Sequence, residues 1–322
     1  MKSLLKILWH ILGLALVIGS IVFFTRYLIA NIGKMPSLRW NADTCFILFS
    51  SLVIYLMHLG LAAYGWRVVL SVLGCDLAFM KGLSVFLISQ FGKYIPGNIA
   101  HHLGRVGLSK KIGVPMRVVL PSLFIELSLL VVCSIILFAL FTELDVMDHL
   151  QTPFAYLLLA ILICTLPLVL PRCVTQFIRL LPPKWQQPVN RIHMTPLQVV
   201  IIMVIYPCVF LTLGGIINLI AVLEFGKDSF FLAVTGIFAL SWLAGFLLPG
   251  APAGIGIREA ILLSLLEPLY GSGTALSLTI LCRIIGSFGD LLGLLFGLVY
   301  YIIKIRKGQY PQNIELKNKL LL

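Results

Sequence analysis

The residues in this chain best suited to chemistry are two arginines, Arg105 and Arg258, each of which follows a Pro-Gly pair by eight residues. The matched positions, all at one fixed offset, are Gly92 and Gly245, Pro96 and Pro249, Gly97 and Gly250, Arg105 and Arg258, and Pro115 and Pro268. A Pro-Gly pair interrupts a helix, so a new helix start is expected after each break. Free N–H groups at a helix start, together with a forked guanidinium, suit the binding of a phosphate. The repeated pattern therefore predicts anion capture.

A lipid phosphate is the guest we expect, because its tail can stay in the bilayer while its headgroup enters a polar slot. The residues predicted to bind it are Arg105, Arg258, Asn98, Gly254, Gly256 and Glu259. Removal of either arginine should then abolish function and leave the fold intact.

Three further charged residues, Glu126, Arg283 and Asp290, fall inside apolar segments, where a charge is costly unless it is paired or hydrated. Glu126 follows the first break and Arg283 follows the second, so a repeat could place them face to face. A second interpretation stays open for all the buried charges. They could form ion pairs that lock helices together, with Arg105 or Arg258 paired to Glu126 or Glu259.

The composition indicates that the apolar segments of this chain lie in lipid. The chain is 60% hydrophobic and 11% charged, with a mean hydropathy of +1.06. Such values exclude a soluble globular protein and predict an all-α polytopic membrane protein. The net charge of +12 is scattered over short loops, which argues against nucleic acid as a partner. No cysteines form a C-x-x-C pattern and His101-His102 has no ligand neighbours, so neither a metal nor a cofactor is expected.

We expect residues 1–322 to form one integral membrane domain with about six full spans and two re-entrant helical hairpins. The predicted spans lie near 7–25, 44–65, 118–141, 154–171, 197–223 and 274–303, each close to the roughly 20 residues that a crossing needs. The hairpins are predicted at 82–117 and 229–268, broken at Pro96-Gly97 and Pro249-Gly250. Ser229 to Leu248 is long enough to cross alone, so a full span remains the alternative for the first arm of the second hairpin.

The distribution of basic residues predicts the orientation. With six spans and a cytoplasmic N-terminus, the inside segments carry 17 Lys or Arg, counted without Arg105, and the outside loops carry four. The positive-inside rule therefore places both termini in the cytoplasm. Three spans separate the hairpins, so these would enter from opposite sides as an inverted repeat. Gly289-x3-Gly293-x3-Gly297 in the last span predicts a flat face for close helix packing.

The two broken stretches resemble the bacterial lysylphosphatidylglycerol synthase transmembrane family. The stretches run from Lys93 to Arg105 and from Leu248 to Ala260, and the second is similar to that family's P-x-P-G-G-x-G-x-R-E pattern. It departs from the pattern at the first proline, where Phe246-Leu247-Leu248 stands, and in having Ala251-Pro252-Ala253 where glycine is usual. The resemblance implies a bacterial inner-membrane protein that flips a lipid between leaflets. The aminoacyl-transfer domain that is often fused to this region is not expected here.

The function predicted is therefore a flippase for an anionic phospholipid or a polyprenyl-phosphate-linked lipid, without enzymatic activity. Two alternatives stay open: a membrane enzyme that uses a lipid carrier, and a non-catalytic subunit of an envelope-biogenesis complex. The acid pair Asp145-x-x-Asp148 is the nearest candidate for a metal-dependent enzyme, but it fits a solvated loop better. The expected partners are a phosphate-bearing membrane lipid and, as protein partner, a second copy or an envelope-biosynthesis enzyme.

Overall fold

The computed structural model describes residues 19, 22–38, 40–95, 99–145, 195–247 and 252–306, and this part of the chain forms helices and loops without a strand. Its long helices are α2 (Ala42–Val72), α5 (Met116–Asp145), α8 (Pro196–Leu223) and α11 (Ser272–Tyr300). Its shorter α-helices are α3 (Phe79–Gln90), α4 (Ala100–Lys111), α9 (Phe231–Leu247) and α10 (Ile257–Tyr270). Short helical turns are η1 (Ile32–Lys34), η2 (Phe91–Tyr94), η3 (Pro252–Gly254) and η4 (Tyr301–Arg306). The predicted all-α class holds for this part of the chain.

All four long helices are apolar enough to cross a membrane. They coincide with the predicted spans at 44–65, 118–141, 197–223 and 274–303, so the chain is a multi-pass membrane protein. The predicted span at 154–171 lies outside the described residues, and the one at 7–25 overlaps them only at 19 and 22–25. The number of six spans therefore stays a prediction.

The outer surface of these helices is apolar. Phe46 and Met57 on α2 are 70% and 67% exposed, and Leu295 and Val299 on α11 are about half exposed. Trp66, by contrast, is fully buried. Large apolar side chains on both the inside and the outside are typical of helices whose surrounding solvent is lipid.

Helices α2 and α8 pack antiparallel along their lengths, and a hydrogen bond fixes each end. At the start of α2, Thr44 Oγ1 donates to Glu224 Oε1, 3.0 Å away, just past the end of α8. At the other end, Gln198 Nε2 of α8 donates to Ser71 Oγ of α2 at 3.1 Å. Thr195 begins α8 with a capping box that also uses Gln198. These contacts set the register of the central helix pair.

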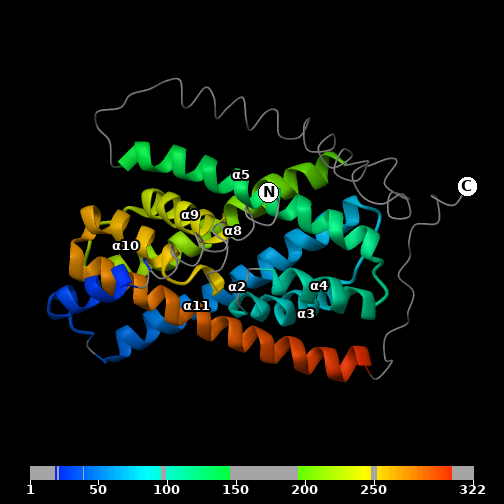
Figure 1. Cartoon of the computed structure of the whole chain (residues 1–322), viewed down its shortest axis with the longest axis horizontal. Helices are drawn as coiled ribbons and strands as arrows, with labels where there is room; N and C mark the ends of the chain where they lie inside the picture. Colours follow the sequence, from blue (N-terminus) through cyan, green and yellow to red (C-terminus); the bar gives the residue numbers. More distant parts are fainter. Residues whose placement is uncertain are drawn as a thin grey trace, which may run out of the picture.

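Small and polar residues bring the other long helices close. Trp66 Nε1 of α2 donates to Ser122 Oγ of α5 at 3.0 Å, which satisfies a buried indole N–H. Gly214 of α8 lies so close to α9 that a Cβ added there would come within 2.6 Å of Thr235 Cα. Figure 1 shows α5 along one long side of the molecule and α11 along the opposite side, with α2, α8 and α9 between them.

The three glycines of α11 form the packing face that the sequence predicts. A Cβ at Gly289 would overlap the Tyr55 ring of α2, and one at Gly293 or Gly297 would press on Leu87 of α3. Helix α11 therefore packs closely on both α2 and α3 through its glycines.

The two broken segments have the helical arms that the hairpin prediction requires. The arms of the first broken segment, α3 and α4, have 12 residues each. The arms of the second broken segment, α9 and α10, have 17 and 14 residues. At about 1.5 Å per residue the arms rise about 18–26 Å, less than the roughly 30 Å hydrocarbon core. In each segment the two arms pack together, and η2 of the first contacts η3 of the second. The helical turns beside the two breaks, although far apart in sequence, therefore meet in space.

Candidate functional site

A cavity of about 190 Å³ lies where the two broken segments meet. Its wall includes four cationic and three anionic side chains: Lys93, Arg105, Arg258, Arg283, Glu126, Glu259 and Asp290. Except for Lys93, all of these were singled out in the sequence, and the fold brings them together. Gly254 also lines the cavity, whereas Gly256 lies buried beside it at the start of α10. Asn98, Pro96, Gly97, Pro249 and Gly250 lie outside the described residues.

Arg105 forms a buried ion pair with Glu126, which joins α4 to α5. The Arg105 side chain is only 2% exposed, and its guanidinium also lies over the rings of Phe86 and Trp66, at 4.3 and 5.1 Å from their centroids. This is the contact that the helix-locking interpretation expects, and the phosphate contact predicted for Arg105 stays a prediction. The expectation that its removal would leave the fold intact no longer follows, because a buried carboxylate would be left alone.

The second ion pair joins Glu259 of α10 to Arg283 of α11, with Oε1 and Nη1 3.1 Å apart. Glu259 Oε2 also accepts a hydrogen bond from the Gly256 N–H at 2.6 Å, which caps the first turn of α10. Arg283 in turn donates to the carbonyl of Ala253 in η3 at 3.3 Å. Glu259 therefore caps the start of α10 and holds Arg283, and the phosphate contact predicted for it stays a prediction.

The expected contact between Glu126 and Arg283 is replaced by these two pairs. Each of the two residues instead binds a partner from its own broken segment, Arg105 for Glu126 and Glu259 for Arg283. Both pairs still lie on the wall of the same cavity.

A third ion pair was missed from the sequence. Lys93 of η2 lies 2.7 Å from Asp290 of α11, whose carboxylate also accepts hydrogen bonds from Tyr55 at 3.0 Å and Tyr94 at 2.6 Å. Lys93 was counted among the loop charges that set the membrane orientation, so its ion pair with Asp290 was not predicted. Its place directly after Gly92, inside the repeated motif, was the signal that could have revealed it.

Arg258 differs from the other cations of the wall because it forms no ion pair with any described residue. Its guanidinium lies over the Phe238 ring, 4.5 Å from the centroid. Its Cβ lies between Gly245 and Gly254, where added Cβ atoms would come within 3.2 and 3.5 Å of it. A side chain at Gly245 would press on the arginine, and one at Gly254 would press on the Gly245 backbone at 3.1 Å, which gives a physical reason for glycine at both positions.

The backbone just before Arg258 adopts left-handed conformations, and these place the Arg258 side chain on the cavity wall. Gly254 and Gly256 have φ values of +71° and +90°, and Ala253 has +50°. Positive φ is readily adopted by glycine and costs about 1–2 kcal/mol for alanine. This strained turn is where α10 starts and where the Arg258 side chain enters the wall.

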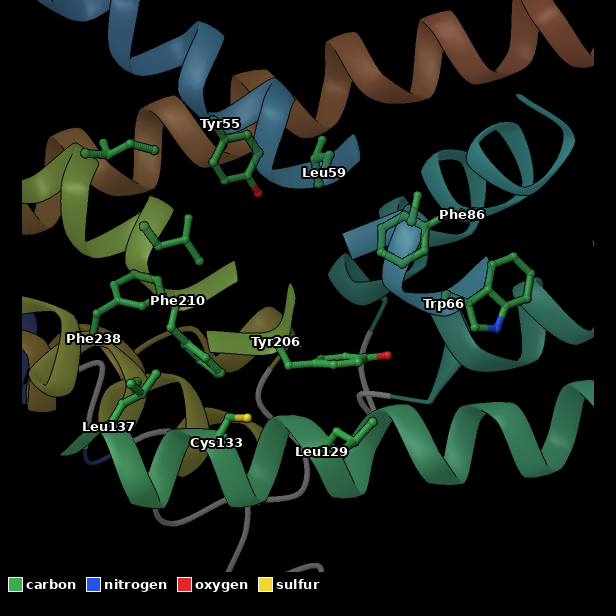
Figure 2. Packing of buried hydrophobic residues seen from close by; sticks show 14 of the residues in the cluster. Tyr55, Leu59, Trp66, Phe86, Leu129, Cys133, Leu137, Tyr206, Phe210 and Phe238 are labelled. Atoms are coloured by element: carbon green, nitrogen blue, oxygen red, sulfur yellow. The ribbon is translucent and has the colours of Figure 1, made fainter. Parts of the chain in front are cut away.

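The remaining wall combines aromatic rings with polar atoms that have no protein partner among the described residues. Figure 2 shows Tyr206 and Phe210 of α8 in the space between α5 and α2. The buried Tyr206 hydroxyl has no hydrogen-bond partner, and the same holds for both ring nitrogens of His102 and one of His101. The two histidine rings lie 3.8 Å apart, and no cluster of three metal-ligating side chains occurs in the described residues. Each of these atoms is buried, with almost no accessible surface.

Two comparisons bear on the identity of the chain. The family profile described as the lysylphosphatidylglycerol synthase TM region matches residues 10–293, nearly the whole sequence. No curated protein matches the sequence significantly. The match includes both breaks and every charged residue of the cavity wall.

Proposed function

Because the chain belongs to the family of lysylphosphatidylglycerol synthase transmembrane regions, we propose that it is a flippase that moves a phosphate-bearing lipid between the leaflets of a membrane. The observation that carries this proposal is Arg258, a cation without an ion-pair partner among the described residues, on the wall of a cavity between two broken helices. An uncompensated cation in a low-dielectric site is costly, and a bound anion offsets that cost.

The proposed transport path uses the two broken segments as re-entrant hairpins. They enter from opposite faces of the bilayer as an inverted repeat, and their breaks meet near its middle. The short arms and the contact between η2 and η3 support this arrangement. Backbone that leaves the helical path is tolerated at membrane depth where it lines a polar cavity, and the cavity supplies that condition.

We further propose that the protein resides in the bacterial inner membrane with both termini in the cytoplasm, and that it acts without chemical catalysis. The headgroup would occupy the cavity while the acyl chains leave between helices. A second copy of the chain or an envelope-biosynthesis enzyme is the proposed protein partner.

Liposomes that contain the purified protein alone test the proposal. Acyl-labelled phosphatidylglycerol and phosphatidic acid, both bearing NBD, are placed in both leaflets, and dithionite bleaches the outer one. We expect bleaching to proceed beyond the outer half with the wild type, to fall strongly with Arg258→Ala and to persist with Lys110→Ala, which alters an exposed lysine outside the cavity.

The outcomes separate the candidate functions. Bleaching no faster than in protein-free liposomes for either lipid would overturn the flippase proposal. Chemical conversion of a labelled lipid by the purified protein would instead support the membrane enzyme. Arg258→Lys should restore only part of the transport, because an ammonium lacks the planar two-point grip of a guanidinium.

A further inference from the structure

Helix α11 contributes one charged side chain to each broken segment. Asp290 pairs with Lys93 of η2 in the first segment, 2.7 Å away, and Arg283 pairs with Glu259 of α10 in the second, 3.1 Å away. Asp290 and Arg283 are seven residues apart, which is about two turns or about 10 Å of helix, so they lie on one face of α11. Gly286, between them on this face, also lines the cavity. This stretch of the cavity wall therefore has an ion pair at each end.

The two ion pairs lie at different depths along α11. Helix α10 packs beside the earlier part of α11 and α3 beside the later part, as Figure 1 shows. In the proposed orientation α11 runs toward the cytoplasm, so the Lys93–Asp290 pair lies about 10 Å nearer to the cytoplasm than the Glu259–Arg283 pair. Each pair therefore lies toward the membrane face from which its own broken segment is proposed to enter.

Both pairs also attach the helical turn beside a break to α11. In the first segment, Tyr94 of η2 donates to Asp290 at 2.6 Å, and its hydroxyl lies 3.3 Å from Ser287 Oγ. In the second segment, Arg283 donates to the carbonyl of Ala253 in η3 at 3.3 Å. Separation of either pair would release the adjoining turn from α11 and widen the cavity on that side.

The exposure of the cations distinguishes these pairs from the Arg105–Glu126 pair. The side chains of Lys93 and Arg283 are 23% and 26% exposed, whereas that of Arg105 is 2% exposed. A charge that keeps part of its surface accessible loses less when its partner leaves than a charge that is sealed from water. The cations of the two α11 pairs can therefore separate from their partners at lower cost than Arg105.

Each carboxylate of the α11 pairs keeps a hydrogen bond when its cation leaves. Asp290 accepts a hydrogen bond from Tyr55 of α2 through its other oxygen, Oδ1, at 3.0 Å. Glu259 accepts one from the N–H of Gly256, at the start of its own helix, at 2.6 Å. A hydrogen bond that remains limits the cost of leaving a buried carboxylate without its cation. The two pairs therefore suit repeated separation.

We propose that these two ion pairs are the gates of the cavity. The Lys93–Asp290 pair closes it toward the cytoplasm, the Glu259–Arg283 pair closes it toward the opposite face, and transport opens them in turn. This inference rests on the proposed lipid transport and specifies how access to its site is controlled. The conformation with both pairs formed is then the closed state between the two openings.

A native cysteine reports which gate is open. Cys282 lies on the cavity wall beside Arg283 and is partly exposed. It is kept as the only cysteine of the full chain, and its modification by the membrane-impermeant thiol reagent MTSES is timed in right-side-out and in inside-out membrane vesicles. The ratio of the two rates measures the balance of the two openings, because any effect of a substitution on the reactivity of the thiol itself enters both rates equally.

Neutral substitutions open one gate at a time. Asp290→Asn keeps the shape of the side chain and removes the charge that holds Lys93, so it should raise the ratio of cytoplasmic to outer modification about tenfold, as expected for the loss of an interaction between charged groups. Glu259→Gln keeps an oxygen for the Gly256 N–H and should lower the ratio by a similar factor. Lys110→Gln, which alters an exposed lysine outside the cavity, should leave the ratio unchanged.

Lys93→Gln tests the cytoplasmic gate a second time, and it replaces Asp290→Asn if thermal unfolding shows that the latter variant does not fold. It should change the ratio in the same direction as Asp290→Asn. The double variant should change it no further than either single variant, because both substitutions remove one contact. Additive changes would show that the two residues act through different contacts and would overturn the gate.

The failures are distinguishable. Unchanged ratios in the variants, or equal acceleration at both faces, would overturn the gates and, with lipid transport by the wild type, leave the flippase proposal standing. Ratios that change in the reverse directions would also overturn the proposal, because each pair would then control the wrong face. Absence of transport for every lipid tested in liposomes would overturn the proposed function itself, whatever the ratios.

Discussion

Breaking the Arg105–Glu126 pair should destabilise the protein, and removing both partners together should restore most of the loss. The Arg105 side chain is 2% exposed and that of Glu126 is 7% exposed, so neither can turn to water when its partner is removed. Breaking a buried pair on one side costs about 3–5 kcal/mol. Replacing both members with apolar residues of similar size is often neutral or stabilising. The variants are Arg105→Met, Glu126→Leu and their combination.

The surroundings refine the magnitude. In Glu126→Leu the arginine still lies over the Phe86 and Trp66 rings, and each such cation–π contact contributes about 0.5–2 kcal/mol. We therefore expect this variant near the lower end of the range, about 3 kcal/mol. Arg105→Met loses both the pair and the ring contacts, so about 4–5 kcal/mol is expected.

Reversible unfolding in mixed micelles with increasing SDS measures the free energy of each variant, and the double-mutant cycle isolates the coupling. The double variant should lie within about 1 kcal/mol of the wild type. If the single variants lie that close to the wild type, or if the double variant loses the sum of both, Arg105 does not serve to lock α4 to α5. Liposome transport by the double variant then shows whether the pair has a part in function beyond stability.

Three further outcomes are expected. Gly214→Ala should lower the free energy of unfolding by about 1–3 kcal/mol, because its Cβ would lie 2.6 Å from the α9 backbone. Gly60→Ala, whose Cβ would meet nothing within 4 Å, should instead stabilise α2 by up to about 1 kcal/mol. The same SDS titration compares the two variants, and equal effects would contradict the close packing of α8 on α9. Gly254→Ala should cost about 1–2 kcal/mol, since φ is +71° and the new Cβ would lie 3.1 Å from the Gly245 backbone in α9. Relief of this contact would shift the turn that begins α10, which carries Arg258, so transport should slow; unchanged transport would count against a role of this turn in placing the arginine. Lys110→Cys and Lys227→Cys, at exposed positions next to the ends of the two broken segments that lie away from the breaks, should react with an impermeant maleimide from opposite membrane faces in a cysteine-free background, and labelling of both from one face would refute the inverted repeat.

Much of the architecture could be predicted because the lipid environment acts on composition and length alone. The four described long helices lie where apolar runs reach about 20 residues, and the first helical break falls between α3 and α4, around Pro96-Gly97. The glycines of α11 also predicted their own packing face, since small residues at a four-residue spacing leave a flat surface. The residues that would carry the site were visible for a similar reason: a charge in an apolar segment is costly enough to stand out in sequence.

What composition and spacing could not determine was which charge pairs with which. Glu126 binds Arg105 and Glu259 binds Arg283, because the crossing of α4 with α5 and of α10 with α11 decides the distances between their side chains. The same packing gives Asp290 its lysine partner and leaves Arg258 above an aromatic ring, without an ion-pair partner in the part of the chain that the structure describes. Sequence alone therefore located the charges in the membrane, and only the tertiary structure decided which of them were neutralised, since ion pairing depends on distances of a few ångströms between residues far apart in the chain.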